Sequence, residues 1–328
     1  MDLNILLPSP VEDIAGPFII DERNADKTSL SSKISVIVKR DDLIHPIISG
    51  NKWRKLSAAL TTISQQQYQH VASFGGAYSN HLHALGYACA ALNINFTAVV
   101  RGDYSKRLTP TLQDLQRWGT HLHFVSKIEY KNKTSAQYCQ LLRQQLNADY
   151  LIPEGGSHAK SIVGVGAIMT ELETQAPDIT HIILPVASAG TLAGLVLNET
   201  LPHVKIIGVG VLKGEGYLED LVNGLLASST PSCQRKEWEI LHDYHHGGYA
   251  KTSASLRQYV SEFNQFYADQ NRLRPLAIEP IYSGKCFYAL NALLSAGYFP
   301  SNSKVLILHT GGLQGARSLP ANKNISTQ

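Results

Sequence analysis

The chain of 328 residues has few charged side chains and almost no net charge. Charged residues make up 17% of it, and 29 Lys and Arg against 26 Asp and Glu leave a formal charge of +3. Proteins that bind nucleic acid usually carry a stronger and clustered basic excess. The composition therefore argues against a nucleic-acid-binding protein. The 44% of hydrophobic residues predicts an ordinary folded globule.

Long hydrophobic runs and closely spaced cysteines are also missing. No stretch approaches the roughly 20 consecutive apolar residues that cross a bilayer. The start, MDLNILLPSPVEDIAG, lacks the basic region and unbroken apolar stretch of a secretory signal. We therefore expect a cytoplasmic protein without a membrane partner. The four scattered cysteines, which we expect to be reduced, are Cys89, Cys139, Cys233 and Cys286.

The usual nucleotide and metal signatures do not occur. There is no GxxxxGK[ST], and the nearest approach to GxGxxG starts at Gly164 and has Met169 in place of its last glycine. Histidines that stand close together form three pairs: His81 with His83, His121 with His123, and His245 with His246. Because none of these spacings supplies a third ligand, we expect no metal site.

Short apolar runs alternate with longer segments of helical period from about residue 70 onward. The predicted strands are 71–74, 96–100, 122–125, 181–186, 205–211 and 305–309. The predicted helices lie within 79–93, 109–119, 135–147, 161–175 and 253–271. This alternation is typical of β-α units, so the sequence predicts an α/β fold with parallel sheets.

Glycine-rich loops follow several of these strands. They read FGGAYSNH, PEGGSH, VASAGTLAG and HTGGLQG. In α/β sheets such loops meet helix N-termini beyond the carboxyl ends of the strands, where unpaired N–H groups bind anions. The loops therefore predict a ligand with at least one anionic group.

The segment 36–56 contains two lysines at the start of a predicted helix. Asn51 is a candidate N-cap, which places Lys52 in the first turn and Lys55 three residues later. Lysine is unfavourable beside the positive end of a helix dipole. One reason for such a lysine is a Schiff base, because an amine that loses its proton near neutral pH attacks aldehydes. Two solvated lysines are the alternative.

Four segments resemble, in their order, the motifs of a known family. They are SGNKWRKL, SFGGAYSNHLHAL, VASAGTLAGL and EPIYSGK. The family is the pyridoxal-phosphate-dependent one that contains D-cysteine desulfhydrase and 1-aminocyclopropane-1-carboxylate deaminase. The resemblance extends from about residue 36 to HTGGLQG near residue 315.

The resemblance implies a particular architecture, the tryptophan synthase β-like fold, also called fold type II. It has two open, mainly parallel twisted sheets flanked by helices. A large cofactor-binding domain would comprise 1–56 and 165–328, and a small inserted domain would comprise 57–164. Members of the family commonly form homodimers.

The same resemblance implies which residues hold pyridoxal 5'-phosphate. Lys52 would carry the cofactor as a Schiff base, and Lys55 would lie near its phosphate. The turn from Ala187 to Leu192 would cradle that phosphate. Its donors would be the hydroxyls of Ser188 and Thr191 and the backbone at Ala189 and Gly190. On its own, Ser188 reads equally as an ordinary turn residue.

Ser79, Asn80 and His81 resemble the family's substrate loop. Asn80 would contact the cofactor's ring hydroxyl, and Ser79 with the neighbouring N–H groups would hold the substrate carboxylate. A serine before a helical segment is also a common N-cap, so a purely structural role for Ser79 stays open.

EPIYSGK places Tyr282 where the family's tyrosine faces the substrate, although a tyrosine that only packs is the alternative. Ser283 would meet the pyridine nitrogen, where cyclopropane deaminases carry glutamate. A serine hydroxyl is a weaker partner than a carboxylate, so we expect a neutral ring. Tyr249 is a candidate second active-site tyrosine.

The resemblance implies α,β-elimination from a small amino acid. Lys52 would act as general base on the Cα proton. We expect D-cysteine as substrate, with pyruvate, hydrogen sulfide and ammonia as products. The alternatives are 1-aminocyclopropane-1-carboxylate deaminase, an amino-acid racemase and a β-replacement synthase. An alternative of another class is a non-catalytic protein that binds pyridoxal phosphate or an amino acid.

Overall fold

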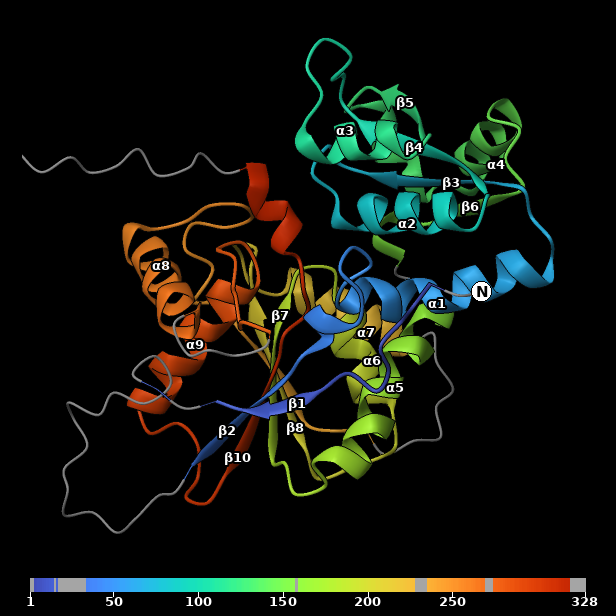
Figure 1. Cartoon of the computed structure of the whole chain (residues 1–328). Helices are drawn as coiled ribbons and strands as arrows, with labels where there is room; N and C mark the ends of the chain where they lie inside the picture. Colours follow the sequence, from blue (N-terminus) through green and yellow to red (C-terminus); the bar gives the residue numbers. More distant parts are fainter. Residues whose placement is uncertain are drawn as a thin grey trace, which may run out of the picture. The chain divides into compact units, whose positions relative to one another are not determined.

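The chain folds into two compact units. The computed structural model describes residues 3–14, 16, 34–156, 159–227, 235–268 and 274–318. One unit comprises Asn4–Ala58 and Ser157–Gly311, and the other comprises Met1–Leu3, Ala59–Gly156 and Gly312–Gln328. Each unit is built on its own sheet (Figure 1). We call them the six-stranded unit and the four-stranded unit. The domain boundaries expected at residues 57 and 164 stay a prediction.

The six-stranded unit contains a mostly parallel sheet. Its strands in spatial order are β1 (Val11–Asp13), β2 (Ser35–Lys39), β10 (Lys304–Leu308), β7 (His181–Val186), β8 (Lys205–Gly210) and β9 (Trp238–Leu241). Only β1 is antiparallel, to β2. The carboxyl ends of β2, β10, β7 and β8 therefore meet at one edge, where α/β proteins place their ligands.

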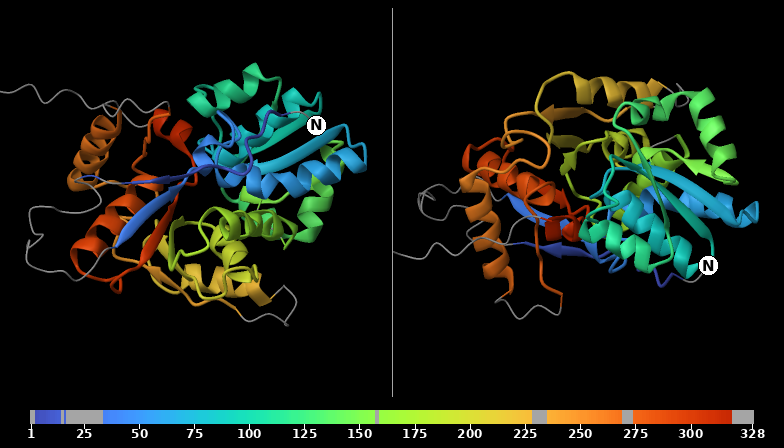
Figure 2. Two further views of the ribbon diagram at one scale, coloured as in Figure 1. Left: turned by 60° about the horizontal axis from the view of Figure 1, so that its bottom comes forward. Right: turned by 90° about the horizontal axis from the view of Figure 1, so that it is seen from above.

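Helices cover both faces of this sheet because alternate strand residues point to opposite sides. Ile182 and Leu184 pack with α5 (Ala159–Gln175), α6 (Gly190–Leu197) and α7 (Tyr217–Ala227). Ile183 and Ile207 pack on the other face with α8 (Ala254–Ala268) and α9 (Ser283–Ser295). The two layers of helices are visible from further directions in Figure 2.

The four-stranded unit has a fully parallel sheet. Its strands in spatial order are β5 (His121–Val125), β4 (Asn95–Arg101), β3 (His70–Gly75) and β6 (Tyr150–Ile152). Its helices are α2 (Asn80–Ala91), α3 (Pro110–Arg117) and α4 (Ala136–Gln145), with the 3-10 helices η2 (Glu129–Thr134), η3 (Glu154–Gly156) and η4 (Leu313–Ser318). A further 3-10 helix, η1 (Asp41–Leu43), belongs to the six-stranded unit.

The predicted α/β class with two mainly parallel sheets is confirmed. The six predicted strands and the five predicted helices all occur, although α8 is described only as far as Ala268. The elements β6, β9, α6, α7 and α9 were not predicted. Cys89, Cys139 and Cys286 are free thiols, whereas Cys233 lies outside the described residues.

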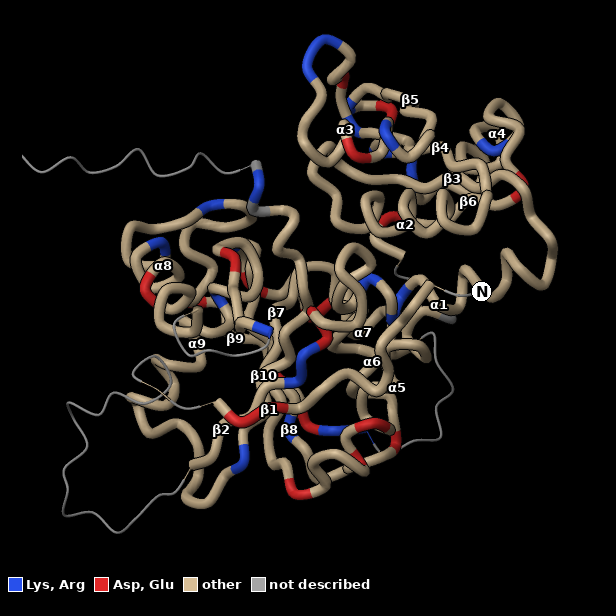
Figure 3. Tube along the Cα trace, in the orientation of Figure 1, with Lys and Arg blue, Asp and Glu red and all other residues tan. Residues whose placement is uncertain are grey.

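Charges are mixed rather than gathered, as Figure 3 shows for the described part of both units. No helix among the described residues is long and apolar enough to cross a membrane. No group of three His, Cys, Asp or Glu residues within the described ranges could hold a metal ion.

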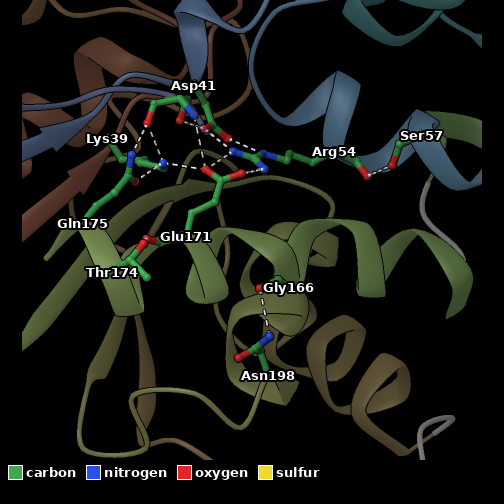
Figure 4. Close-up of polar contacts among 10 residues, drawn as sticks. Lys39, Asp41, Arg54, Ser57, Gly166, Glu171, Thr174, Gln175 and Asn198 are labelled. Atoms are coloured by element: carbon green, nitrogen blue, oxygen red, sulfur yellow. Dashed lines mark hydrogen bonds and ion pairs between the residues drawn. The ribbon is translucent and has the colours of Figure 1, made fainter. Parts of the chain in front are cut away.

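Helix α1 (Asn51–Gln65) is anchored by a buried ionic network (Figure 4). Arg54 donates to both oxygens of Asp41 at 3.1 and 2.9 Å and to both oxygens of Glu171 at 2.5 and 2.9 Å. Lys39, at the end of β2, donates to Glu171 at 2.6 Å and to Gln175 at 2.6 Å. Two cations thus face two carboxylates, so the charges of the network cancel.

Glu171 accepts hydrogen bonds from both cations of this network, Arg54 and Lys39. Burial opposes its ionisation, but the ion pairs with Arg54 and Lys39 prevail and lower the pKa of Glu171. A depressed carboxylate pKa contributes stability above the ordinary glutamate value. That contribution is lost as the pH falls through the folded-state pKa.

We expect Glu171→Gln to lower the free energy of unfolding by on the order of 3 kcal/mol, because it leaves two buried cations with a single carboxylate. Chemical denaturation at pH 7 would measure the loss. Asp178→Asn is the control, since Asp178 pairs with Lys304 at the surface and should leave stability nearly unchanged. Equal effects of the two substitutions would contradict the importance of the network.

Candidate active site

The loop that leads into α1 is pressed against the loop that follows β10. Gly50 has a φ of +63°, and a Cβ atom there would lie 1.7 Å from the carbonyl oxygen of Thr310. The backbone N–H of Asn51 donates to the same carbonyl at 3.3 Å. Only glycine fits this position, so the contact fixes where α1 begins.

Asn51 connects the start of α1 to the start of α6. Its Nδ2 donates to Thr191 Oγ1 at 3.0 Å, and its Oδ1 accepts from Lys52 Nζ at 2.7 Å. The expected N-cap role differs from what is observed, because Asn51 is itself the first helical residue and its side chain reaches α6 instead. Lys52 lies in the first turn, as predicted.

The turn after β7 presents polar groups to Lys55. The Lys55 ammonium donates to Ser188 Oγ at 3.2 Å, and the Gly190 N–H donates to the Ser188 carbonyl at 2.7 Å. Ala189 adopts a left-handed conformation with a φ of +58°, which directs the chain into α6. Leu192 is fully buried, so its side chain packs in the core beneath the turn. The predicted part of Leu192 and Ala187 in a phosphate cradle stays a prediction, and it would be confined to their backbone.

Burial shifts both lysines toward their neutral forms. It lowers the pKa of Lys52 to about 8. Burial and the neighbouring charge of Lys52 lower the pKa of Lys55 to about 7. A helix start, two lysines with depressed pKa values and a turn with hydroxyl groups together favour an anion, which would relieve the repulsion.

These residues fit the phosphate and the aldehyde of pyridoxal phosphate. Ser188, Thr191 and the N-terminus of α6 offer the donors that a phosphate requires. Lys55 supplies a cation beside Ser188. Lys52 supplies an amine that is largely neutral only slightly above physiological pH, as covalent attachment to an aldehyde requires.

Two tyrosines meet at the N-terminus of α9. Tyr282 donates its hydroxyl to that of Tyr249 at 3.1 Å, and their ring centroids are 6.2 Å apart. Burial and the neighbouring Tyr249 hold the pKa of Tyr282 well above its ordinary value. The buried ammonium of Lys285 donates to the carbonyl of Gly248 at 2.8 Å, which fastens the chain next to Tyr249. The Tyr282 hydroxyl therefore keeps its proton and can donate a hydrogen bond.

Ser283 is the first residue of α9 and is bonded to a buried acid that the sequence analysis did not identify. Glu279 is 1% exposed, and its backbone N–H donates to Ser283 Oγ at 2.9 Å. Its carboxylate accepts from the N–H groups of Ile281, Tyr282 and Ser283 at 2.7 to 2.8 Å. An acid four residues before the helix start was the only sequence signal for it.

The predicted substrate loop lies in the four-stranded unit, at the N-terminus of α2. Ser79 is the N-cap, and its hydroxyl accepts from the Leu82 N–H at 3.2 Å. Asn80 is packed against η4, since a Cβ atom on Gly315 would lie 3.2 Å from Asn80 Oδ1. Ser79 therefore has the N-cap role that was the alternative to substrate binding. Contacts of Ser79 and Asn80 with substrate or cofactor stay predictions.

His81 points into the core of the same unit. Its Nε2 lies 2.8 Å from Ser73 Oγ, and that hydroxyl donates to the Ile152 carbonyl at 2.9 Å. Because the Ser73 hydrogen is used for Ile152, the proton on the first bond belongs to His81 Nε2. This contact fixes the ring of His81, and its expected contact with substrate stays a prediction.

A second histidine on α2 joins a charged cluster that the motifs did not indicate. His83 Nε2 lies 2.9 Å from Asp114 Oδ2 on α3, and Arg317 of η4 pairs with the same carboxylate. Burial lowers the pKa of His83 despite Asp114. The cluster holds η4 on α2 and α3, and thereby holds Gly315 against Asn80.

The structure thus assembles the predicted residues in two groups. Apart from Asn80, the predicted cofactor residues and both tyrosines belong to the six-stranded unit, at the edge where the parallel strands end. Ser79, Asn80 and His81 belong to the four-stranded unit. Within the six-stranded unit, direct bonds join Asn51 to Lys52 and Thr191, Lys55 to Ser188, and Tyr282 to Tyr249.

Comparisons with known proteins agree with this arrangement. The family model described as "Pyridoxal-phosphate dependent enzyme" matches residues 24–311. The chain is 29% identical over 296 residues to the bifunctional D-cysteine desulfhydrase/1-aminocyclopropane-1-carboxylate deaminase of Arabidopsis thaliana, covering 85% of this chain and 72% of the relative. It is 26% identical over 291 residues to a putative 1-aminocyclopropane-1-carboxylate deaminase of Pyrococcus abyssi, covering 86% of each.

Solved structures support the fold. A crystal structure of an ACC deaminase homologue matches with a TM-score of 0.71 and 24% identity, covering 95% of this chain and 91% of that one. A pyridoxal 5'-phosphate-dependent aspartate racemase matches with a TM-score of 0.61 and 18% identity, covering 93% and 90%. The resemblance found in the sequence is confirmed. The chain belongs to the family of pyridoxal-phosphate-dependent enzymes, and pyridoxal phosphate is its cofactor.

Proposed function

We propose that this enzyme catalyses α,β-elimination from a small amino acid, with D-cysteine as the preferred substrate. The observation that carries the proposal is that Lys52, whose pKa is lowered to about 8, and the bonded pair Tyr282 and Tyr249 belong to the same six-stranded unit. Lys52 can lose its proton near neutral pH and act as a base, whereas the Tyr282 hydroxyl keeps its proton and can donate a hydrogen bond. Elimination uses both, because a proton leaves Cα while negative charge develops on the departing group.

Pyridoxal phosphate supplies, when bound, an electron sink for the charge that develops at Cα. Lys55, Ser188 and Thr191 hold its phosphate, and Lys52 provides the amine for covalent attachment. Ser79 and the N–H groups at the N-terminus of α2 bind the substrate carboxylate, and Asn80 would contact the ring hydroxyl of the cofactor. Pocket geometry sets which face of Cα meets the Lys52 amine.

Lys52 removes the Cα proton once its amine is released by the incoming amino acid. The Cβ–S bond then breaks, and its electron pair leaves with sulfur. Tyr282 or Tyr249 donates a hydrogen bond to the departing hydrosulfide, which leaves as the anion and takes its proton from solvent. The remaining aminoacrylate takes up water and yields pyruvate and ammonia. The tyrosine pair suits this step because burial keeps the pKa of Tyr282 high and its hydroxyl protonated.

Relatives named for aminocyclopropane carboxylate make ring opening of that substrate the second candidate. Ser283 disfavours it, since we expect a glutamate there in the deaminases. A racemase or β-replacement synthase would use the same base and phosphate site. We also propose that the protein forms a homodimer, as the family resemblance implies, and that it is located in the cytoplasm.

The reaction is tested by the release of pyruvate and sulfide with D-cysteine, L-cysteine or aminocyclopropane carboxylate. We expect equal amounts of both products from D-cysteine and at least tenfold less from L-cysteine. Ammonia and a four-carbon keto acid from aminocyclopropane carboxylate would favour the deaminase. Racemised cysteine without sulfide would show that the enzyme catalyses racemisation and not elimination.

Loss of the Lys55 ammonium should weaken cofactor binding. We expect Lys55→Gln to raise the dissociation constant for pyridoxal phosphate about tenfold to a hundredfold, because one charge-assisted bond to phosphate is lost. Fluorescence titration of the apoprotein measures this. The matched control is Lys236→Gln, since Lys236 is also buried but bonds to the Asn198 carbonyl. An unchanged constant for Lys55→Gln would refute the phosphate assignment.

Covalent uptake of the cofactor should depend on pH in a defined direction. Only the neutral amine attacks an aldehyde, so the rate should rise as Lys52 loses its proton, with a midpoint near its pKa of about 8. Stopped-flow absorbance of apoprotein mixed with pyridoxal phosphate follows this rate. A midpoint near 10.5, the value of a solvated lysine, would contradict the role of burial.

A further inference from the structure

The buried acid Glu279 has no part in the reaction as described above. The hydrogen bonds of its carboxylate lie at the N-terminus of α9. Its Oε2 accepts from the Ile281 N–H at 2.7 Å. Its Oε1 accepts from the N–H groups of Tyr282 and Ser283, both at 2.8 Å. Three N–H donors at the positive end of a helix are the surroundings of an ionised carboxylate.

The surroundings of Glu279 both favour and oppose the ionisation of its carboxyl group. Burial raises the pKa of Glu279, and the N–H groups oppose that shift. The ammonium of Lys285, one turn away on α9, interacts favourably with the carboxylate. Tyr282 is neutral at ordinary pH. The ionised form is therefore supported by donors on the backbone and by one nearby cation.

The Ser283 hydroxyl forms hydrogen bonds with Glu279 both as an acceptor and as a donor. It accepts from the Glu279 N–H at 2.9 Å. It donates to Glu279 Oε1 at 3.2 Å. The Glu279 carbonyl is a more distant acceptor at 3.4 Å. A hydroxyl has one hydrogen and two lone pairs. Once the hydrogen and one lone pair are used, a single lone pair remains, and that lone pair can only accept a hydrogen bond.

We propose that Glu279 is a positioning residue that, through the Ser283 hydroxyl, keeps the pyridine nitrogen of the bound cofactor protonated. The proposal rests on the placement of Ser283 beside that nitrogen in the proposed function. A protonated nitrogen donates to the remaining lone pair of Ser283. A neutral nitrogen needs a donor, and Ser283 could provide one only by giving up its bond to the carboxylate.

This proposal is the opposite of the expectation of a neutral ring, which was based on serine alone. Charge on the carboxylate makes the hydroxyl oxygen a stronger acceptor, as cooperative hydrogen-bond chains do. The deaminases are expected to hold a glutamate directly at the nitrogen, whereas here the acid stands one hydrogen bond further away. A protonated ring is the stronger electron sink and suits the removal of the Cα proton.

The test is the 15N chemical shift of the ring nitrogen in the enzyme loaded with 15N-labelled pyridoxal phosphate. The wild-type enzyme should show the shift of a protonated pyridine at pH 7. Glu279→Gln and Ser283→Ala should each move it toward the neutral value. The control is Glu239→Gln, which removes another carboxylate of the same unit, one that pairs with Lys205, and should leave the shift unchanged.

The outcomes separate this proposal from the proposed function. A neutral nitrogen in the wild-type enzyme, or a shift that Glu279→Gln and Ser283→Ala leave unmoved, overturns the role of Glu279 while the cofactor stays bound at Lys52. If Glu279→Gln does not fold, Ser283→Ala carries the test, because Glu279 keeps its three backbone donors there. Failure of the wild-type protein to take up labelled cofactor at Lys52 would instead overturn the site itself.

Discussion

The structure depends on how the three cations at the start of α1 are held. Lys52, Arg54 and Lys55 stand where the helix dipole disfavours positive charge. Arg54 is buried between Asp41 and Glu171, so its charge is matched within the fold. Lys52 and Lys55 bond to the neutral oxygens of Asn51 and Ser188, and burial lowers the pKa of both. The same helix therefore has one face that anchors it and another that attracts an anion.

The rest of the six-stranded unit converges on the edge where α1 begins. The parallel strands β2, β10, β7 and β8 end there, and their loops meet through backbone contacts such as Gly50 with Thr310. The N-termini of α6 and α9 bring a turn with hydroxyl groups, a tyrosine pair and the Ser283–Glu279 contact. Lys52, Thr191 and Ser283 thus stand in the first turns of helices, whose fixed geometry favours chemistry that relies on orientation.

Sequence patterns predicted what local periodicity encodes. Alternating apolar segments predicted an α/β fold with parallel sheets, and the family resemblance implied that there are two. The SGNK segment placed Lys52 in a first helical turn. Strands β6 and β9, with three and four residues, were too short to show a period. The network around Arg54 was not predictable because its carboxylates come from residues 13 positions before and 117 positions after it. Likewise, the contact of His81 with Ser73 exists only once α2 is packed on β3.

The central claim is that Lys52 is the residue to which the cofactor is attached. It is tested most directly by borohydride reduction of the cofactor-loaded enzyme, followed by digestion and mass spectrometry of the modified peptide. The account predicts one phosphopyridoxyl group per chain, on Lys52. Modification of Lys55 or Lys285 with Lys52 unmodified would contradict it.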